Sequence, residues 1–311
     1  MMYATPTGTR DVLHSELREL RAITDALRDA YEARGYGEVR TPAIEFDSVL
    51  RGSSIEPGYR VIDDHGNVMA LRPDMTVPIA RLGATRFAGV EPPLRFSYLA
   101  HVYRSVRPHR GETRELLQSG IELLGAAGPD GTAEVLSVLC AALDAAGLRD
   151  YRIALGSAAV YPRVLAALGV GEEVGPALLG ALAAGDFVRL SELASDNGLS
   201  EELVAVSRMR GGREILDGVP GDAAGALRGV LDAADAAVRD RVVVDLGLTR
   251  NLGYYTGAVF DVLHPSLGSP IGGGGRYDDL VGRFGRDMPA AGFAIEVDQL
   301  HSALMAEEPA A

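Results

Sequence analysis

Residues 94–125 read LRFSYLAHVYRSVRPHRGETRELLQSGIELLG and decide the fold class of this chain. Residues 94–106 and 116–125 have the apolar and aromatic pattern of strands, and the charged stretch between them, with Pro and Gly, is typical of a loop. The two segments therefore predict a long antiparallel hairpin. Such a hairpin argues against a doubly wound parallel sheet. It favours an α+β core, in which an antiparallel sheet is flanked by helices.

Helical and strand patterns continue on both sides of the hairpin. Apolar residues recur at three- and four-residue steps from Leu13 to Tyr31, which predicts a long amphipathic helix ending near Gly35. Residues 133–148 predict a second, apolar helix. Further strands are predicted at residues 152–155, 242–246, 254–263 and 292–297.

The middle of the chain has a different character. Residues 171–240 are rich in Ala, Gly, Leu and Asp, with helical periodicity and no strand signal. Their 13 acidic and 6 basic residues give a balance of −7, about half of the chain's −13, which we interpret as a solvated face. We predict that residues 1–168 and 241–311 form the core and that residues 169–240 form a helical insertion.

Bulk properties exclude several classes of protein. A net charge of −13 and a pI near 4.9 argue against a tightly held nucleic acid. The single cysteine, Cys140, excludes an internal disulfide and stands in an apolar run. Without a secretory signal or an apolar run of about 20 residues, we expect a cytoplasmic protein. The six histidines show no metal-ligand spacing, and we expect neither a metal nor a cofactor.

Two polar constellations precede the middle of the chain. In LRPDMT (71–76), Asp74 and Thr76 are two residues apart and share a face if the segment is extended, where they suit an ammonium group. The alternative is a turn closed by the aspartate. Gln118 and Glu122 point the same way on the second hairpin strand, and Arg104 faces them from the first. They form either a polar site or a solvated sheet face.

Two further constellations lie near the C-terminal end. In RNLGYYTGAVF (250–260), Arg250 suits a carboxylate, and Tyr254 and Tyr255 are either core or site residues. The run of four glycines at 272–275, followed by Arg276 and Tyr277, indicates close approach of the backbone to a ligand or to another backbone. The alternative is a flexible hairpin tip. No helix with Lys follows, so we predict no P-loop.

In this order along the chain, the motifs resemble those of histidyl-tRNA synthetases, which have the class II aminoacyl-tRNA synthetase fold. RNLGYYTGAVF and GGGGRYDDL (272–280) resemble that family's two histidine-specific signatures. Residues 7–13 resemble its opening, and residues 36–45, 96–125 and 292–300 resemble its three class-defining motifs, the first of which usually forms a dimer interface.

The resemblance implies a pocket for histidine. It implies that Asp74 and Thr76 meet the amino group, that Gln118 and Glu122 fix the ligand, and that Arg250 meets the carboxylate. Tyr255 and Tyr277 are implied near the imidazole, and Arg104 and Tyr254 complete the set. These pairings are chemically sensible: a carboxylate binds an ammonium group, an arginine binds a carboxylate, and polar rings bind an imidazole.

The residues at positions where synthetases bind ATP differ from the synthetase pattern. Gln299 stands where the family has the arginine that clamps the γ-phosphate, and Val106, Glu112 and Gly253 replace other charged positions. Losing several charged contacts of roughly 1.5–3 kcal/mol each should abolish adenylation. We therefore expect no catalytic residues. Few residues follow Gln299, so we also expect no anticodon-binding domain and no tRNA.

These departures, together with LRPDMTVPIAR (71–81), resemble the regulatory subunits of ATP phosphoribosyltransferase, a class of synthetase-like paralogues. The resemblance implies a non-catalytic subunit of the first enzyme of histidine biosynthesis, required for full activity and for feedback by L-histidine. It implies a homodimer within a hetero-oligomer that contains a short-form catalytic subunit, with no membrane partner. Two alternatives remain: an enzyme that activates histidine outside translation, and a binding module for tRNA or another protein.

Overall fold

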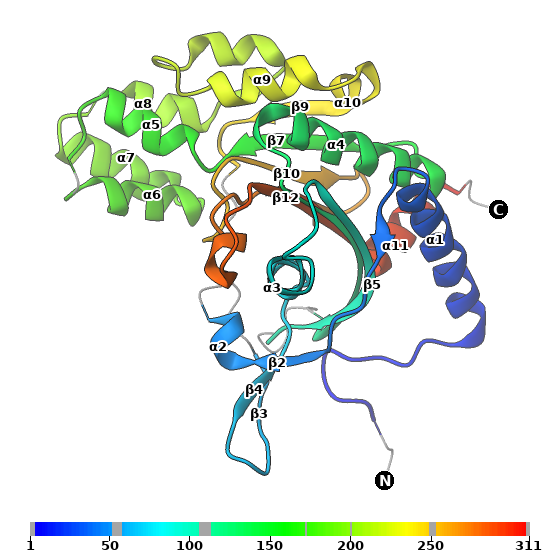
Figure 1. The fold of residues 1–311 in the computed structure, drawn as a ribbon. Coiled ribbons are helices and arrows are strands. Elements are labelled where there is room, and N and C mark those ends of the chain that lie inside the picture. Colours follow the sequence, from blue (N-terminus) through cyan, green and yellow to red (C-terminus); the bar gives the residue numbers. More distant parts are fainter. Residues whose placement is uncertain are drawn as a thin grey trace.

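The computed structural model describes residues 4–51, 58–105, 113–171, 173–199, 201–248 and 253–308. Its centre is a large curved sheet with helices on both faces, and a small second sheet lies at one edge (Figure 1). Of the helices that the structure describes, none combines the length and the apolar run that crossing a bilayer requires.

The large sheet has nine strands and is mostly antiparallel, which confirms the predicted α+β class. Among the strands that the structure describes, the pairs β1–β5 and β7–β9 are the parallel ones. In spatial order, the strands are β1 (Gly37–Glu38), β5 (Leu94–Tyr103), β6 (Glu115–Leu124), β12 (Ala290–Glu296), β11 (Gly272–Arg276), β10 (Ala258–Leu263), β7 (Arg152–Ser157), β9 (Val242–Asp245) and β8 (Arg210–Gly211).

The hairpin of β5 and β6 is the antiparallel pair that the sequence predicts. Leu94 pairs with Leu124 at one end and Tyr103 pairs with Glu115 at the other. Strand β5 ends at Tyr103, three residues before the predicted end, and residues 106–112 of the connecting loop lie outside the described residues. Because β12 pairs with β6, segments from the two ends of the chain form the centre of the sheet.

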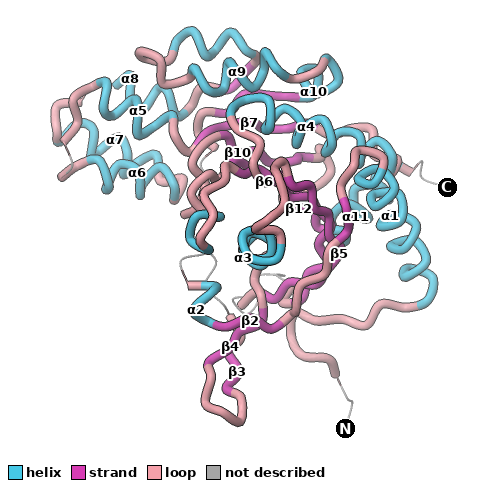
Figure 2. Tube along the Cα trace, viewed as in Figure 1, coloured by secondary structure: helices cyan, strands magenta, loops and turns pink. Residues whose placement is uncertain are grey.

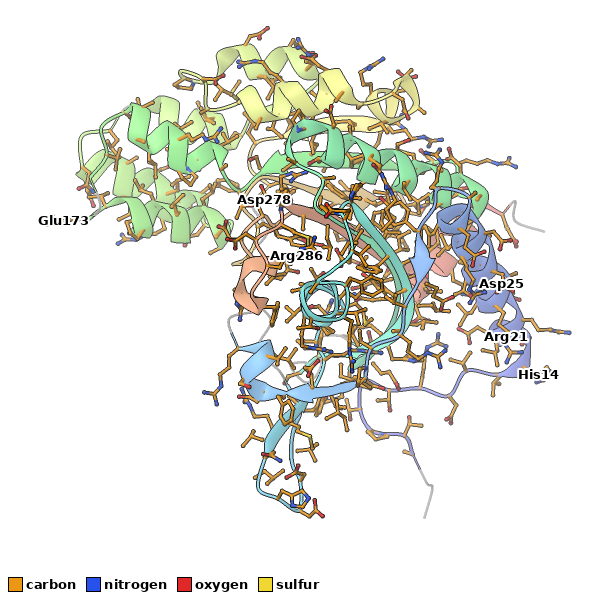
Figure 3. The ribbon with its side chains drawn as sticks, viewed as in Figure 1. His14, Arg21, Asp25, Glu173, Asp278 and Arg286 are labelled. Atoms are coloured by element: carbon orange, nitrogen blue, oxygen red, sulfur yellow. The ribbon has the colours of Figure 1, made fainter. Side chains whose placement is uncertain are left out.

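Three helices cover the convex face of the sheet: α1 (His14–Glu32), α4 (Gly128–Ala145) and α11 (Val297–Glu307). Helix α1 buries Leu20, Ile23, Leu27 and Tyr31 against the others, while its outer face carries charged residues such as Arg21 and Asp25 (Figure 3). The left-handed backbone of Gly35, with φ of 80°, follows α1 as predicted.

The concave face of the sheet holds a second apolar core. Helix α3 (Thr76–Arg86) lies in the curve of β5, β6 and β12 (Figure 2). Ile79 of α3, Phe96 of β5 and Leu124 of β6 belong to the buried cluster there. The 3₁₀ turn η2 (Val281–Phe284), helix α2 (Asp47–Leu50) and the small sheet β2 (Ile44–Phe46), β4 (Val68–Leu71) and β3 (Arg60–Ile62) complete this side.

Residues 169–240 form short helices at the end of the sheet beyond β7. After α5 (Val160–Ala167) come α6 (Gly175–Ala183), α7 (Phe187–Asp196), α8 (Glu201–Ser207), η1 (Arg213–Gly218), α9 (Gly225–Ala233) and α10 (Ala236–Arg241). The helical periodicity is confirmed, but the expectation of no strand is wrong: β8 pairs with β9. With only two residues, β8 is too short to show a period in the sequence.

Candidate functional site

A cavity of about 420 Å³ lies on the concave face, between the first residues of α3 and the middle of the large sheet. Its volume suits a small metabolite. Seven of the nine residues that the sequence predicts for the site line it: Asp74, Thr76, Arg104, Gln118, Tyr254, Tyr255 and Tyr277. Glu122 touches two of these residues, and Arg250 lies outside the described residues.

The floor of the cavity consists of residues with little or no side chain. Gly273, Gly292 and Ala294 line it from β11 and β12. At Gly120, opposite Ala294 on β6, a Cβ atom would stand 2.7 Å from Cζ of Tyr98. The Tyr98 hydroxyl passes over this glycine and donates to the carbonyl oxygen of Phe293 at 3.3 Å. Small residues at the sheet centre therefore leave room for a ligand and for the tyrosine beside it.

The glycine run at 272–275 is strand β11 and not a hairpin tip. All its residues are buried between β10 and β12. A Cβ at Gly274 would collide with the carbonyl oxygen of Gly292, and one at Gly275 would lie 2.8 Å from the Tyr255 ring. The close approach that the sequence suggests is thus to neighbouring strands and to a wall of the cavity.

Asp74 and Thr76 reach the cavity by a different route from the predicted one. The extended segment is wrong, because Thr76 begins helix α3. Asp74 lies just before it, and its Oδ1 accepts from the Val77 amide at 3.0 Å, as in a turn closed by an aspartate. Its Oδ2 is buried and has no hydrogen-bond partner among the described residues. Burial raises the pKa of the Asp74 carboxyl.

Glu122 lies on the same face of β6 as Gln118, as their spacing predicts. It is 1% exposed and accepts a hydrogen bond from Thr76 Oγ1 at 2.8 Å and another from the Tyr277 hydroxyl. Burial raises the pKa of Glu122 to about 8, although these two hydrogen bonds lower it. Glu122 therefore joins α3, β6 and the end of β11 beneath the cavity.

Three tyrosines form one wall of the cavity. Ring centroids lie 4.9 Å apart for Tyr254 and Tyr255 and 5.7 Å apart for Tyr254 and Tyr277. The first two precede β10, so the predicted strand begins four residues late, at Ala258. The Tyr277 amide donates to the Ala290 carbonyl oxygen at 2.8 Å, and Oδ1 of the next residue, Asp278, accepts from Arg276 at 2.7 Å and from the Ala290 amide at 3.1 Å.

Arg104 meets a partner that the sequence did not single out. Its Nη1 lies 3.1 Å from Oε1 of Glu296, the last residue of β12, and its Nε donates to the Pro73 carbonyl oxygen at 3.3 Å. The strand alternation Gly292, Ala294, Glu296 was the available signal, because it places the glutamate on the cavity side opposite Gln118. Tyr98 and Phe293 also line the cavity and were missed.

Of the four positions where the sequence departs from the synthetase pattern, two are described. Gln299 lies on α11 and does not line the cavity, and Gly253 is exposed just before Tyr254. Val106 and Glu112 lie outside the described residues.

The cavity has more acidic than basic groups. The carboxyl groups of Asp74 and Glu296 line it together with one guanidinium, that of Arg104, which is the sole cationic side chain among the described lining residues. Such an arrangement suits a ligand with a cationic group and a polar ring more than a phosphate. No three metal-ligating side chains come together in the described ranges.

Comparison with known proteins gives a consistent result. A sequence model of the histidyl-tRNA synthetase family matches residues 8–300. The chain is 43% identical to the ATP phosphoribosyltransferase regulatory subunit of Symbiobacterium thermophilum, over 97% of this chain and 79% of that protein.

Solved structures agree. A protein of Bacillus halodurans C, described as an ATP phosphoribosyltransferase regulatory subunit/histidyl-tRNA synthetase, has a TM-score of 0.90 at 30% identity over 98% of this chain and 84% of that one. A histidine–tRNA ligase subunit of Alicyclobacillus acidocaldarius has a TM-score of 0.83 at 33% identity over 99% of both chains. These likenesses confirm the predicted synthetase-like fold.

Proposed function

The chain belongs to the family of ATP phosphoribosyltransferase regulatory subunits, and from this premise we propose that it binds L-histidine in the cavity on the concave face and regulates a separate catalytic subunit. The main support for histidine as the ligand is the buried Oδ2 of Asp74. This residue lines the cavity, and its Oδ2 has no hydrogen-bond partner among the described residues. A buried carboxylate without a partner is costly, and an ammonium group would supply that partner.

The remaining walls fit the rest of a histidine molecule. Gln118 and the three tyrosine rings offer hydrogen bonds and ring surfaces to an imidazole. Arg104 offers its guanidinium to a carboxylate, and the resemblance to histidyl-tRNA synthetases assigns Arg250 to the same group. We assign Thr76 and Glu122 to holding the ammonium side of the cavity in shape, because they are hydrogen-bonded to each other at 2.8 Å.

We further propose that the chain does not activate an amino acid. Adenylation needs cationic groups that neutralise the phosphates of ATP. Among the described residues, the cavity offers Arg104 alone, and this side chain is already paired with Glu296. Gln299, which replaces the family's phosphate-clamping arginine, cannot neutralise charge. No observation on the chain favours the alternative, an enzyme that activates histidine.

Titration calorimetry of the purified chain with L-histidine tests whether histidine is the ligand. We expect binding by the wild type and a loss of at least about tenfold in affinity for Asp74→Asn, equivalent to one charge-assisted contact. Glu45→Gln is the matched control, since Glu45 is a buried carboxylate that pairs with Arg81 outside the cavity. Equal affinity of Asp74→Asn and wild type would contradict the assignment. ATP–pyrophosphate exchange dependent on histidine would contradict the non-enzymatic role.

The regulatory role is tested with the partner. We expect a short-form ATP phosphoribosyltransferase to be more active with the chain than without it, and L-histidine to inhibit the complex. Asp74→Asn should keep the activation and weaken the inhibition. By linkage, histidine can change activity only if its affinity differs between active and inactive states of the complex. If Asp74→Asn leaves the inhibition by L-histidine unchanged, the histidine site responsible for feedback is not this cavity.

We also propose that two copies associate through the small sheet. Phe46, Met69 and Val61 are cross-strand neighbours and therefore share one face, where Phe46 is 52% and Val61 43% exposed. An apolar face of this kind marks an interaction surface. Phe46→Asp should shift the chain from dimer to monomer in analytical ultracentrifugation. Val188→Asp, at a 71% exposed position on α7 and away from the small sheet, is the control and should leave the dimer intact.

A further inference from the structure

Arg104 and Glu296 face each other at the open side of the cavity. Arg104 follows the end of β5, and Glu296 ends β12, 192 positions later in the sequence. Both side chains line the cavity, and they are 31% and 23% exposed. The pair is thus built by the tertiary fold and stands where a ligand would enter.

A second contact, on the side of the Arg104 guanidinium opposite Glu296, fixes its position. The Pro73 carbonyl oxygen accepts from Arg104 Nε at 3.3 Å, so the Nη atoms point into the cavity, and Nη1 meets Oε1 of Glu296 at 3.1 Å. The backbone of Glu296 is fixed too, because its amide donates to Ile271 at 2.9 Å and it pairs with Gln118. A ligand anion that approaches Arg104 must therefore displace, or share the guanidinium with, the Glu296 carboxylate.

We propose that Glu296 is a specificity-determining residue, a built-in carboxylate that competes with ligand anions for Arg104. A compact ligand with one carboxylate can exchange with Glu296, because one anion replaces another. A polyphosphate cannot, because its additional charges meet Glu296 and Asp74. The inference rests on the proposed function for the identity of the ligand. It adds that Glu296 is the residue that keeps nucleotides from binding in the cavity.

A purely structural role for the pair predicts something different. Partly exposed ion pairs contribute little to stability, so Glu296→Gln should remain folded. A structural pair would leave anion affinity unchanged in that variant. A competing carboxylate would raise it, and the gain would depend on Arg104.

The test uses inorganic pyrophosphate, without divalent cations, titrated into the full chain. We expect Glu296→Gln to bind pyrophosphate at least about tenfold more tightly than wild type, and Arg104→Gln in the same background to remove the gain. Asp298→Asn is the matched control: it removes an acidic group two residues away that pairs with Arg10 outside the cavity. No gain in Glu296→Gln, or an equal gain in Asp298→Asn, overturns the proposal.

Two amino-acid probes separate this inference from the proposed function. L-Histidine should bind Glu296→Gln more tightly than wild type, while L-histidinol, which lacks the carboxylate, should bind both equally. If wild type binds no histidine, the proposed function fails, and the pyrophosphate titration still decides the role of Glu296. If wild type binds histidine but Glu296→Gln does not increase the affinity for pyrophosphate, the proposed role of Glu296 is wrong and the proposed histidine site stands.

Discussion

Thr76, the first residue of α3, donates from its hydroxyl to Oε1 of Glu122, near the end of β6, at 2.8 Å. The two residues are 46 positions apart, and their hydrogen bond fixes the start of the helix over the sheet. Since Asp74 lies two residues before Thr76, the same bond sets the position of the carboxylate that lines the cavity. The shape of the cavity therefore depends on a buried polar contact as well as on apolar packing.

Thr76→Val should test this contact with little change in volume. The variant leaves Glu122 with the Tyr277 hydroxyl as its remaining side-chain donor among the described residues, and we expect a loss of roughly 1–3 kcal/mol in the free energy of unfolding, measured with urea. Thr85→Val is the control on the same helix, because its exposed hydroxyl bonds to the Arg81 carbonyl oxygen. Equal stability of the two variants would contradict the role of the Thr76–Glu122 bond.

The pKa of Glu122 makes stability depend on pH. Burial raises that pKa from 4.5 to about 8, so the folded chain holds this proton more tightly than the unfolded chain. The stabilisation is therefore fully present below pH 4.5 and is lost as the pH rises towards 8. Within this window, the unfolding free energy of wild type relative to Glu122→Gln should fall by about 1.4 kcal/mol per pH unit. A pH-independent difference would show that Glu122 is ionised in the folded chain.

Asp74→Asn should improve the stability of the empty protein while it weakens ligand binding. The asparagine keeps the oxygen that accepts from the Val77 amide and removes a buried charge without a described partner. We expect a gain of about 1 kcal/mol in unfolding free energy at pH 8. Asp47→Asn is the contrast, because both oxygens of Asp47 are paired, with Arg51 and Arg60, and the same change should destabilise there. Destabilisation by both changes would mean that Asp74 has a partner in the empty protein.

Gly120→Ala should disturb the floor of the cavity. The added Cβ would collide with the carbonyl oxygen of Phe293 on β12 and would stand 2.7 Å from Cζ of Tyr98. The β12 backbone and the Tyr98 ring must therefore both shift, and the hydrogen bond between them is lost. Overpacking of this kind costs roughly 1–3 kcal/mol, seen as a lower urea midpoint, and histidine affinity should fall with it. Gly89→Ala is the control, since no atom beyond its chain neighbours lies within 4 Å of the position that the added methyl group would take, and its φ is not left-handed. A neutral Gly120→Ala would show that the sheet relaxes locally.

The sequence predicted the parts of the site that depend on period and type, and missed those that depend on tertiary placement. The four-residue spacing of Gln118 and Glu122 on a strand was sufficient to put them on one face. It could not reveal that Arg104 meets Glu296, because 192 positions separate them. The extended route to Asp74 was wrong because Thr76 starts a helix, and the alternative that the sequence offered, a turn closed by the aspartate, agrees with the bond from the Val77 amide to Asp74.

The glycine run shows the same division between local and tertiary information. Four adjacent glycines weaken a strand considered alone, which made a hairpin tip a reasonable alternative. In the folded chain, the run is a central strand because neighbouring backbones and the Tyr255 ring occupy the space that Cβ atoms would need. Close approach was predictable from composition, whereas the identity of the neighbours was not.

The division of the chain at residues 169–240 remains a proposal that hydrogen exchange can test. Helix α7 buries only Leu190 and Ala194, whereas β12 lies between β6 and β11 with most of its residues buried. Amides of α7 should therefore exchange through local opening at lower free energy than those of β12. Helix α9 buries Leu227, Val230 and Leu231 and packs directly on α4, so it should exchange between these limits. Equal protection of α7 and β12 would mean that residues 169–240 open only with the core and are not a separate unit.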